Sequence, residues 1–339
     1  MFGGFLYTIM QYFNSKKTRV AWIDWMKTIG IYFIVLGHFF SIGHKFIYVF
    51  NVPLFFLISG FLCKKEKDNR LFLNKLLYNL IIPMVIISTI VFLYLSIRHE
   101  TIEIINIVRF LEYGLLGYHY GIHECWFVYT LCLLKIIYQY CPRSPIFYTI
   151  GFFCLFGAYV FNHIDLSHYN SLFKASNSLV NVFTAFPFYA AGVFLRDFKE
   201  QLDKMRNYIM LGFTFVCGMV LVYLSAYNNG YVWMYICSYG GNMLWFLLGG
   251  IAGAASIFVI SKMLGRAPMF VEKISNGTIL ILGFHIYIIP LFSRFYHNSY
   301  YDFISAFVIV LLFIPIIILA EKHFPLLLGK YRLNKIREL

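Results

Sequence analysis

The sequence predicts an all-α integral membrane protein, a polytopic bundle of about ten transmembrane helices with both termini in the cytoplasm. Three observations lead to this fold class. Hydrophobic residues form 60% of the chain and charged residues only 13%, long apolar segments recur from end to end, and basic residues collect in alternate connections. A soluble chain of 339 residues could not cover this much apolar surface with so few polar side chains.

The apolar segments have the length that a bilayer crossing needs, about 20 residues. About ten segments meet this criterion. We expect helices at 20–42, 46–63, 75–97, 125–141, 145–162, 178–195, 207–226, 242–262, 274–294 and 302–321. We find no polar linker between two domains, so residues 1–339 are expected to form a single membrane domain. Residues 1–18 would lie on the membrane as an interfacial segment, and 322–339 would form a basic cytoplasmic tail.

Basic residues test this arrangement independently of hydrophobicity. If the chain starts inside and crosses ten times, the inner connections and termini hold about 21 of the 28 lysines and arginines, and the outer connections about 5. This bias is typical of a multi-pass protein of the cytoplasmic membrane. The net charge of +13 is therefore explained by topology and does not indicate a nucleic-acid partner.

Neither a metal site nor a disulfide framework is expected. The seven cysteines show no paired spacing, and most lie in apolar segments. His119 and His123 are four residues apart beside Glu124, a spacing that can hold a metal on a helix. Gly121 interrupts the helix pattern and no third ligand is obvious, so a loop that contacts substrate or only solvent is the better interpretation.

The first predicted helix carries three ionisable residues, Asp24, Lys27 and His38. Such residues are costly in a bilayer unless they face protein or water. At about 100° per residue all three project toward one side, with His38 about 16 Å beyond Lys27 along the axis. They are expected to line a buried cavity as its catalytic residues, with His38 acting as a general base. The alternative is a structural ion pair between Asp24 and Lys27, with His38 hydrogen-bonded to a neighbouring helix.

The sequence predicts a role for three further residues at membrane depth. Pro53 removes a backbone donor, so the second helix is expected to start or break there, or simply to begin with an ordinary proline. His285, in the middle of the ninth predicted helix, either lines the cavity or binds a backbone carbonyl. Trp126 opens the fourth helix, where an aromatic belt at the membrane surface would explain it.

Several of these segments resemble the acyltransferase 3 family of integral membrane O-acyltransferases. The stretch 19–38 is similar to the family's first helix, in which a basic residue precedes a histidine, here Lys27 and His38. Residues 51–61, Asn-Val-Pro-Leu-Phe-Phe-Leu-Ile-Ser-Gly-Phe, resemble the second-helix motif. Trp126-Phe127 and the segment 274–285 resemble two later motifs.

The resemblance covers nearly the whole chain, with one departure. The family often carries arginines in its third helix before a proline, whereas here only Lys75 supplies charge ahead of Pro83. This departure leaves open how the donor is bound at that helix.

The resemblance implies transfer of an acyl group, usually acetyl, to a carbohydrate hydroxyl at a bacterial membrane. The donor would be cytosolic acetyl-CoA, a cosubstrate rather than a bound cofactor, and the acceptor a cell-envelope glycan or its polyprenyl-linked precursor. His38 would take the hydroxyl proton during attack on the thioester. Lys27, with Arg19 and Lys75, would hold the anionic CoA.

The acceptor is expected to contact residues near the outer surface and in the cavity: Tyr120, His123, Glu124, Trp126, His285 and Asn51. Two other classes stay open, a transporter or flippase for a glycan or lipid, and an inactive relative that only binds a partner. Polar stripes and many crossings would serve a transporter equally well. Consumption of the acyl-CoA thioester separates the enzyme from both.

Overall fold

The computed structural model describes residues 19–40, 43–98, 125–141, 145–163, 177–293 and 299–330. Regular structure in these ranges is helical, apart from one isolated β-bridge between Trp233 and Ser238. The expected all-α class is therefore confirmed. The expected interfacial segment 1–18, and part of the expected tail, lie outside the described residues.

Each of the ten predicted apolar segments contains a helix. In chain order these are α2 (Ala21–Gly37), α3 (His44–Leu62), α5 (Ile82–Arg98), α7 (Cys125–Tyr140), α8 (Pro145–His163), α9 (Asn177–Leu195), α11 (Tyr208–Asn229), α12 (Met243–Met263), α14 (Thr278–Ser293) and α15 (Ser299–His323). A helix suits apolar segments in a bilayer because it satisfies its backbone hydrogen bonds internally.

Shorter helical pieces connect or extend these ten. They are α4 (Asn69–Leu76), the π-helical turn Leu77–Ile81, the 3₁₀ turn Arg196–Phe198, α10 (Lys199–Lys204), the 3₁₀ turn Met234–Ile236, α13 (Met269–Asn276) and the 3₁₀ turn Pro325–Leu328. The π-helical turn joins α4 to α5, so that Asn69–Arg98 forms one long helix.

Within the described ranges, five helices are long and apolar enough to cross a membrane: α3, the joined α4–α5 helix, α11, α12 and α15. The pair α13 and α14 bends by 82° at Gly277 and makes a sixth crossing only if the two are counted together. Helices α2 and α7 are shorter, with 17 and 16 residues. The prediction of ten crossings, with both termini inside, stays a prediction.

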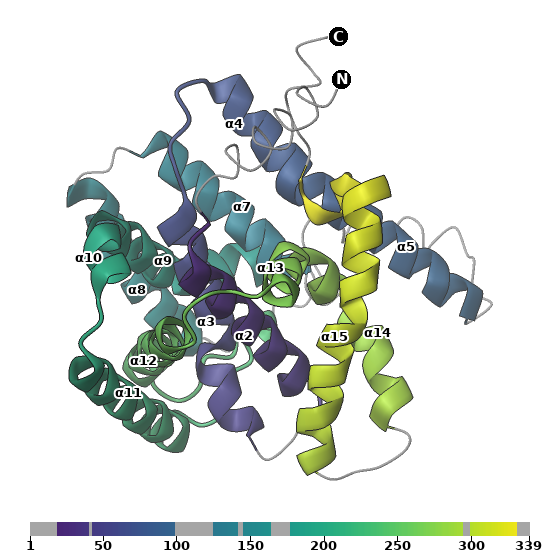
Figure 1. Ribbon diagram of the computed structural model, residues 1–339. Coiled ribbons are helices and arrows are strands. Elements are labelled where there is room, and N and C mark those ends of the chain that lie inside the picture. The colour runs from purple at the N-terminus through teal and green to yellow at the C-terminus, as the bar shows by residue number, and fades with distance from the viewer. Residues whose placement is uncertain are drawn as a thin grey trace, which may run out of the picture.

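Helix α2 lies in the middle of the bundle, as Figure 1 shows. It packs against α3, α12, α13, α14 and α15. Ile31 and Val35 join a hydrophobic cluster with α14 and α15, whereas Trp22 and Met26 join a second cluster with α3 and α12. Packing on several sides fixes the position of α2 and hence of its polar residues.

The expectation for Pro53 is wrong. Helix α3 runs from His44 to Leu62 with Pro53 in its interior. The neighbouring helix α12 supplies the physical reason, because its glycines let it approach α3 closely at this point. A side chain at Gly250 would meet Pro53, and one at Gly253 would overlap Phe50. A closely packed neighbour supports a helix through a proline that removes one hydrogen bond.

Candidate active site

A cavity of about 560 Å³ lies beside α2, within the size range of small-molecule binding pockets. Its lining comes from α2, α3, α7, α14, the π-helical turn and the segment before α12. Most of the lining is apolar. The polar residues among it are Lys27, His38, Tyr48, Asn51, Ser59, Trp126, Lys135, Trp233, Tyr235 and Thr278.

Lys27 and His38 both line this cavity. Helix α2 is continuous from Ala21 to Gly37, and His38 follows directly after it. The two residues are therefore about 16 Å apart along the axis, on one side of the helix. The structure brings together the basic residue and the imidazole of the expected polar stripe, at two different depths of one cavity.

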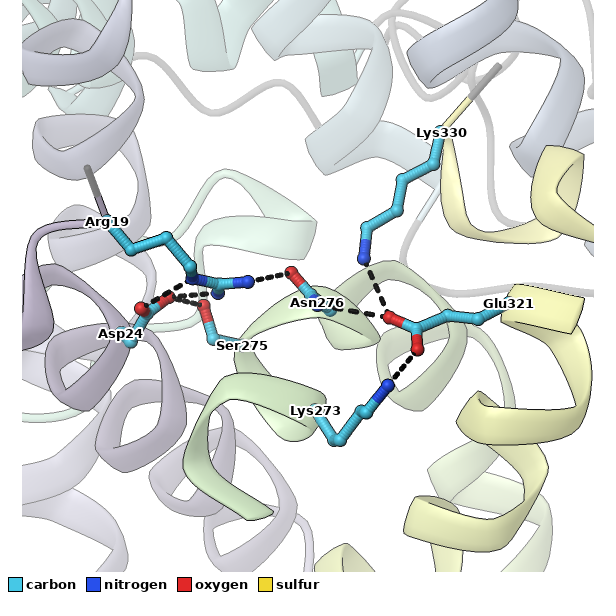
Figure 2. A network of polar contacts seen from close by, with 7 residues as sticks. All are labelled: Arg19, Asp24, Lys273, Ser275, Asn276, Glu321 and Lys330. Atoms are coloured by element: carbon cyan, nitrogen blue, oxygen red, sulfur yellow. Dashed lines mark hydrogen bonds and ion pairs between the residues drawn. The ribbon is translucent and has the colours of Figure 1, made fainter. Parts of the chain in front are cut away.

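Asp24 has a different environment, which Figure 2 shows. Its carboxylate accepts hydrogen bonds from Arg19, at 2.6 Å from Nη2 and 3.0 Å from Nε, and from the Ser275 hydroxyl at 2.6 Å. The hydrogen bond and charge of Asp24 raise the pKa of the Arg19 guanidinium above its ordinary value. Asp24 is buried but is not among the described residues that line the cavity. An ion pair between Asp24 and Lys27 was considered above, but Asp24 forms its ion pair with Arg19.

The same polar network continues from Arg19 to α15 (Figure 2). Arg19 donates to the side-chain oxygen of Asn276 at 3.1 Å, and the Asn276 amide donates to Glu321 at 3.0 Å. Glu321 also forms ion pairs with Lys273 and Lys330. These contacts join the start of α2 to α13, α15 and the segment that follows it, so the network fixes the position of α2, which carries Lys27.

Lys75 also has a carboxylate partner. Its ammonium group lies 2.7 Å from Glu66. The backbone of Glu66 exchanges two hydrogen bonds with the Gln139 side chain, at 3.1 and 2.9 Å. Arg19 and Lys75 are thus paired within the protein and lie outside the described lining, whereas Lys27 lines the cavity.

His285 lies beside His38. It is fully buried, and the centroids of the two imidazole rings are 4.9 Å apart. Its Nδ1 is 2.9 Å from the carbonyl oxygens of both Ile281 and Leu282. Carbonyl oxygens only accept hydrogen bonds, so Nδ1 carries the proton and Nε2 of the neutral ring is an acceptor. This Nε2 is buried and has no hydrogen-bond partner among the described residues.

Of the other residues expected to bind substrate, Asn51 and Trp126 line the cavity. Tyr120, His123 and Glu124 lie outside the described residues, as does His119. Within the described ranges, no group of three histidine, cysteine or acidic side chains is placed to hold a metal ion.

Two parts of the lining were not expected to form it. Lys135 of α7 lines the cavity as Lys27 does, and a lysine inside an apolar helix is itself the signal that could have found it. The segment Val232 to Tyr235 also lines the cavity, held by a hydrogen bond of 2.8 Å from Asn181 to the Met234 carbonyl. That segment is short and largely apolar, so its sequence gave no such signal.

The sequence model of the acyltransferase 3 family, described as an acyltransferase domain, matches residues 20–321. The chain belongs to this family. The match runs from the start of α2 into α15 and includes all described residues of the cavity lining, so the cavity of this membrane acyltransferase lies inside its family domain. Neither the curated proteins nor the solved structures gave a match.

Proposed function

We propose that this membrane acyltransferase moves an acyl group, acetyl in the simplest case, from cytosolic acyl-CoA to a hydroxyl of a carbohydrate or polyprenyl-linked glycan of the cell envelope. The observation that carries the proposal is the cavity beside α2, lined by a histidine at one depth and by a lysine about 16 Å away. An imidazole suits proton transfer near neutral pH, and a lysine suits an anionic donor.

The proposed reaction begins at His38. A sugar hydroxyl is a poor nucleophile, so the unprotonated imidazole accepts its proton while the oxygen attacks the thioester carbonyl carbon. The tetrahedral intermediate collapses, the carbon–sulfur bond breaks, and the leaving sulfur takes the proton back from the imidazolium. The products are the acyl ester and free CoA. The Asn51 amide and Trp126 indole, both in the lining, supply N–H donors for the oxyanion or for sugar hydroxyls.

His285 is proposed to assist His38 rather than to contact the acceptor. Its Nε2 is an acceptor beside the His38 ring. A hydrogen bond from the His38 imidazolium to this nitrogen would stabilise the charge that His38 gains during attack. This assignment explains why a polar atom is buried there without a hydrogen-bond partner among the described residues.

Among the basic residues expected to hold CoA, Lys27 is the one we propose to contact it. The charges of Arg19 and Lys75 are balanced by Asp24 and Glu66. Removing them from those partners would leave buried or half-buried carboxylates unpaired, which is costly. Lys27, in contrast, faces the chamber in which the donor would lie.

The proposal is tested with the purified protein in lipid vesicles, supplied with labelled acetyl-CoA and a panel of lipid-linked glycans. We expect wild type to release CoA and label an acceptor, and His38→Ala to lower the rate by about 10²–10⁴-fold, the usual contribution of a general base. His323→Ala, at an exposed histidine that ends α15, is the matched control and should keep full activity.

The outcomes separate the role of His38 from the reaction class, and the enzyme from a transporter. Equal rates for wild type and a folded His38→Ala variant would contradict the assignment of His38 while leaving the reaction class intact. If wild type released no CoA with any acceptor but moved a glycan lipid across the vesicle membrane, the transporter interpretation would replace the enzyme.

A further inference from the structure

Two lysines line the cavity from different helices, Lys27 from α2 and Lys135 from α7. No aspartate or glutamate is among the described residues of the lining. Within the part of the chain that the structure describes, neither lysine has a hydrogen bond or an ion pair, although the charge of Asp24, three residues earlier on α2, also acts on Lys27. Other basic residues near this end of the bundle, Arg19 and Lys75 among them, do have carboxylate partners.

Two like charges in one mostly apolar cavity raise the free energy of the folded protein when no ligand is bound. A charged group removed from bulk water needs a compensating charge or hydrogen bonds, and two like charges in one mostly apolar chamber repel each other. The cavity therefore favours a ligand that carries negative charge. A phosphate or diphosphate group meets this requirement, because lysine ammonium groups bind phosphate oxygens as point charges.

The two lysines lie at similar depths from the same end of the bundle. Trp22, at the start of α2, packs against Phe61, at the end of α3, with ring centroids 5.2 Å apart. The connection after α3 binds the end of α7 through Gln139. Lys27 is six residues into α2 and Lys135 five residues before the end of α7, so both lie roughly 8–9 Å from that end.

The distance along α2 from the level of the two lysines to His38 matches the length of the pantetheine arm of CoA. In CoA, about 13 bonds separate the diphosphate from the sulfur, which span roughly 16 Å when extended. That reach equals the separation of about 16 Å between Lys27 and His38 along α2. We propose that Lys27 and Lys135 together bind the diphosphate of acyl-CoA inside the cavity, so that the extended pantetheine arm places the thioester at His38. This inference rests on the function proposed above.

Binding of CoA to the full-length protein in lipid nanodiscs tests this directly and needs no acceptor. We expect wild type to bind CoA and dephospho-CoA, which both keep the diphosphate. Lys135→Met and Lys27→Met should each raise the Kd for both by about 10–100-fold, the effect of one lost charged hydrogen bond. Binding of pantetheine, which has no phosphate, should stay unchanged, and Lys135→Arg should keep most of the affinity for CoA.

Lys64→Met is the matched control, because Lys64 is an exposed lysine just after α3 at the same end of the bundle and is not in the lining. Ligand-free Lys135→Met should also unfold at a temperature a few degrees above wild type, since an unpaired charge is removed. A lysine with a purely structural role would give the opposite shift, together with equal losses of CoA and pantetheine binding, and that result would overturn the proposal.

Three further outcomes separate this inference from the proposed donor and from a lipid diphosphate acceptor. If wild type binds CoA and both methionine variants bind it equally well, the diphosphate site is wrong while the proposed donor stands; if wild type does not bind CoA at all, the proposed donor itself fails. Farnesyl diphosphate serves as the probe for a lipid diphosphate. Loss of its binding in the variants, with CoA binding intact, would assign the lysines to the acceptor and overturn the proposal.

Discussion

At the scale of single residues, charge pairing separates the structural from the functional candidates around α2. Asp24 shares its carboxylate with Arg19 and Ser275, whereas Lys27 and His38 face the cavity. Helical geometry was enough to predict that Lys27 and His38 lie on one side of α2, but Asp24, expected in the same cavity, is not in its described lining. Helical geometry could not predict the partner of Asp24, because Ser275 is 251 residues away in the sequence and only the folded chain brings it near.

Asp24 was expected to be catalytic, and its contacts lead to a sharper prediction. Asp24→Asn keeps the shape of the side chain but leaves Arg19 without its carboxylate, which should cost about 1–3 kcal/mol of unfolding free energy. The affinity for CoA should change less than about threefold, since Asp24 lies outside the lining. Thermal unfolding and CoA binding of the same sample measure both effects.

Ser275→Ala provides the graded control for this prediction. It removes one hydrogen bond to the same carboxylate and should cost only about 0.5–1.5 kcal/mol. If Asp24→Asn abolished acyl transfer while the unfolding temperature stayed at the wild-type value, Asp24 would have to act in the reaction itself.

At the scale of elements, close approach of helix backbones positions the walls of the cavity. Helix α3 supplies Asn51 and Ser59 to the lining and packs tightly against α9. A side chain at Gly192 of α9 would overlap the carbonyl oxygen of Leu57, and one at Gly60 would overlap the carbonyl oxygen of Tyr189. Small residues at such points allow helices in a membrane to approach closely.

Gly192→Ala should therefore destabilise the protein by about 1–3 kcal/mol, because the overlapping atom is backbone and cannot move aside. Gly212→Ala in α11 is the matched control, since a side chain there would meet no atom within 4 Å. The control should be neutral or slightly stabilising. Thermal unfolding in one detergent compares the two variants, and identical midpoints would contradict the proposed close contact.

The sequence predicted the existence of helices better than their shape. Apolar length located a helix in each expected segment, because a bilayer span needs about 20 apolar residues wherever it occurs. The ninth segment was expected as one helix at 274–294, but the chain bends by 82° at Gly277, which packs closely against Ile317 of α15. That contact depends on a partner 40 residues away in sequence, and no local pattern encodes it.

At the scale of the whole molecule, the residues that line the cavity distinguish one end of the bundle from the other. Lys27 and Lys135 lie near the end that the positive-inside rule predicts to be cytoplasmic, and His38 lies farther along α2. In the proposed function an anionic donor enters from that end and the acceptor hydroxyl meets the thioester at His38. The sequence revealed the two residues of α2 at these depths. Lys135 stands out as a lysine in an apolar helix, but the sequence could not place it in the same cavity as Lys27, because a cavity wall shared by α2 and α7 exists only after folding.

The measurement that tests this account most directly is an electron cryomicroscopy structure of the protein in nanodiscs with a non-transferable thioether analogue of acetyl-CoA. The account predicts ligand density inside the cavity, with the diphosphate between Lys27 and Lys135 and the acyl carbonyl beside His38. Ordered density for the analogue elsewhere on the protein, with the cavity beside α2 filled by lipid or water, would contradict it.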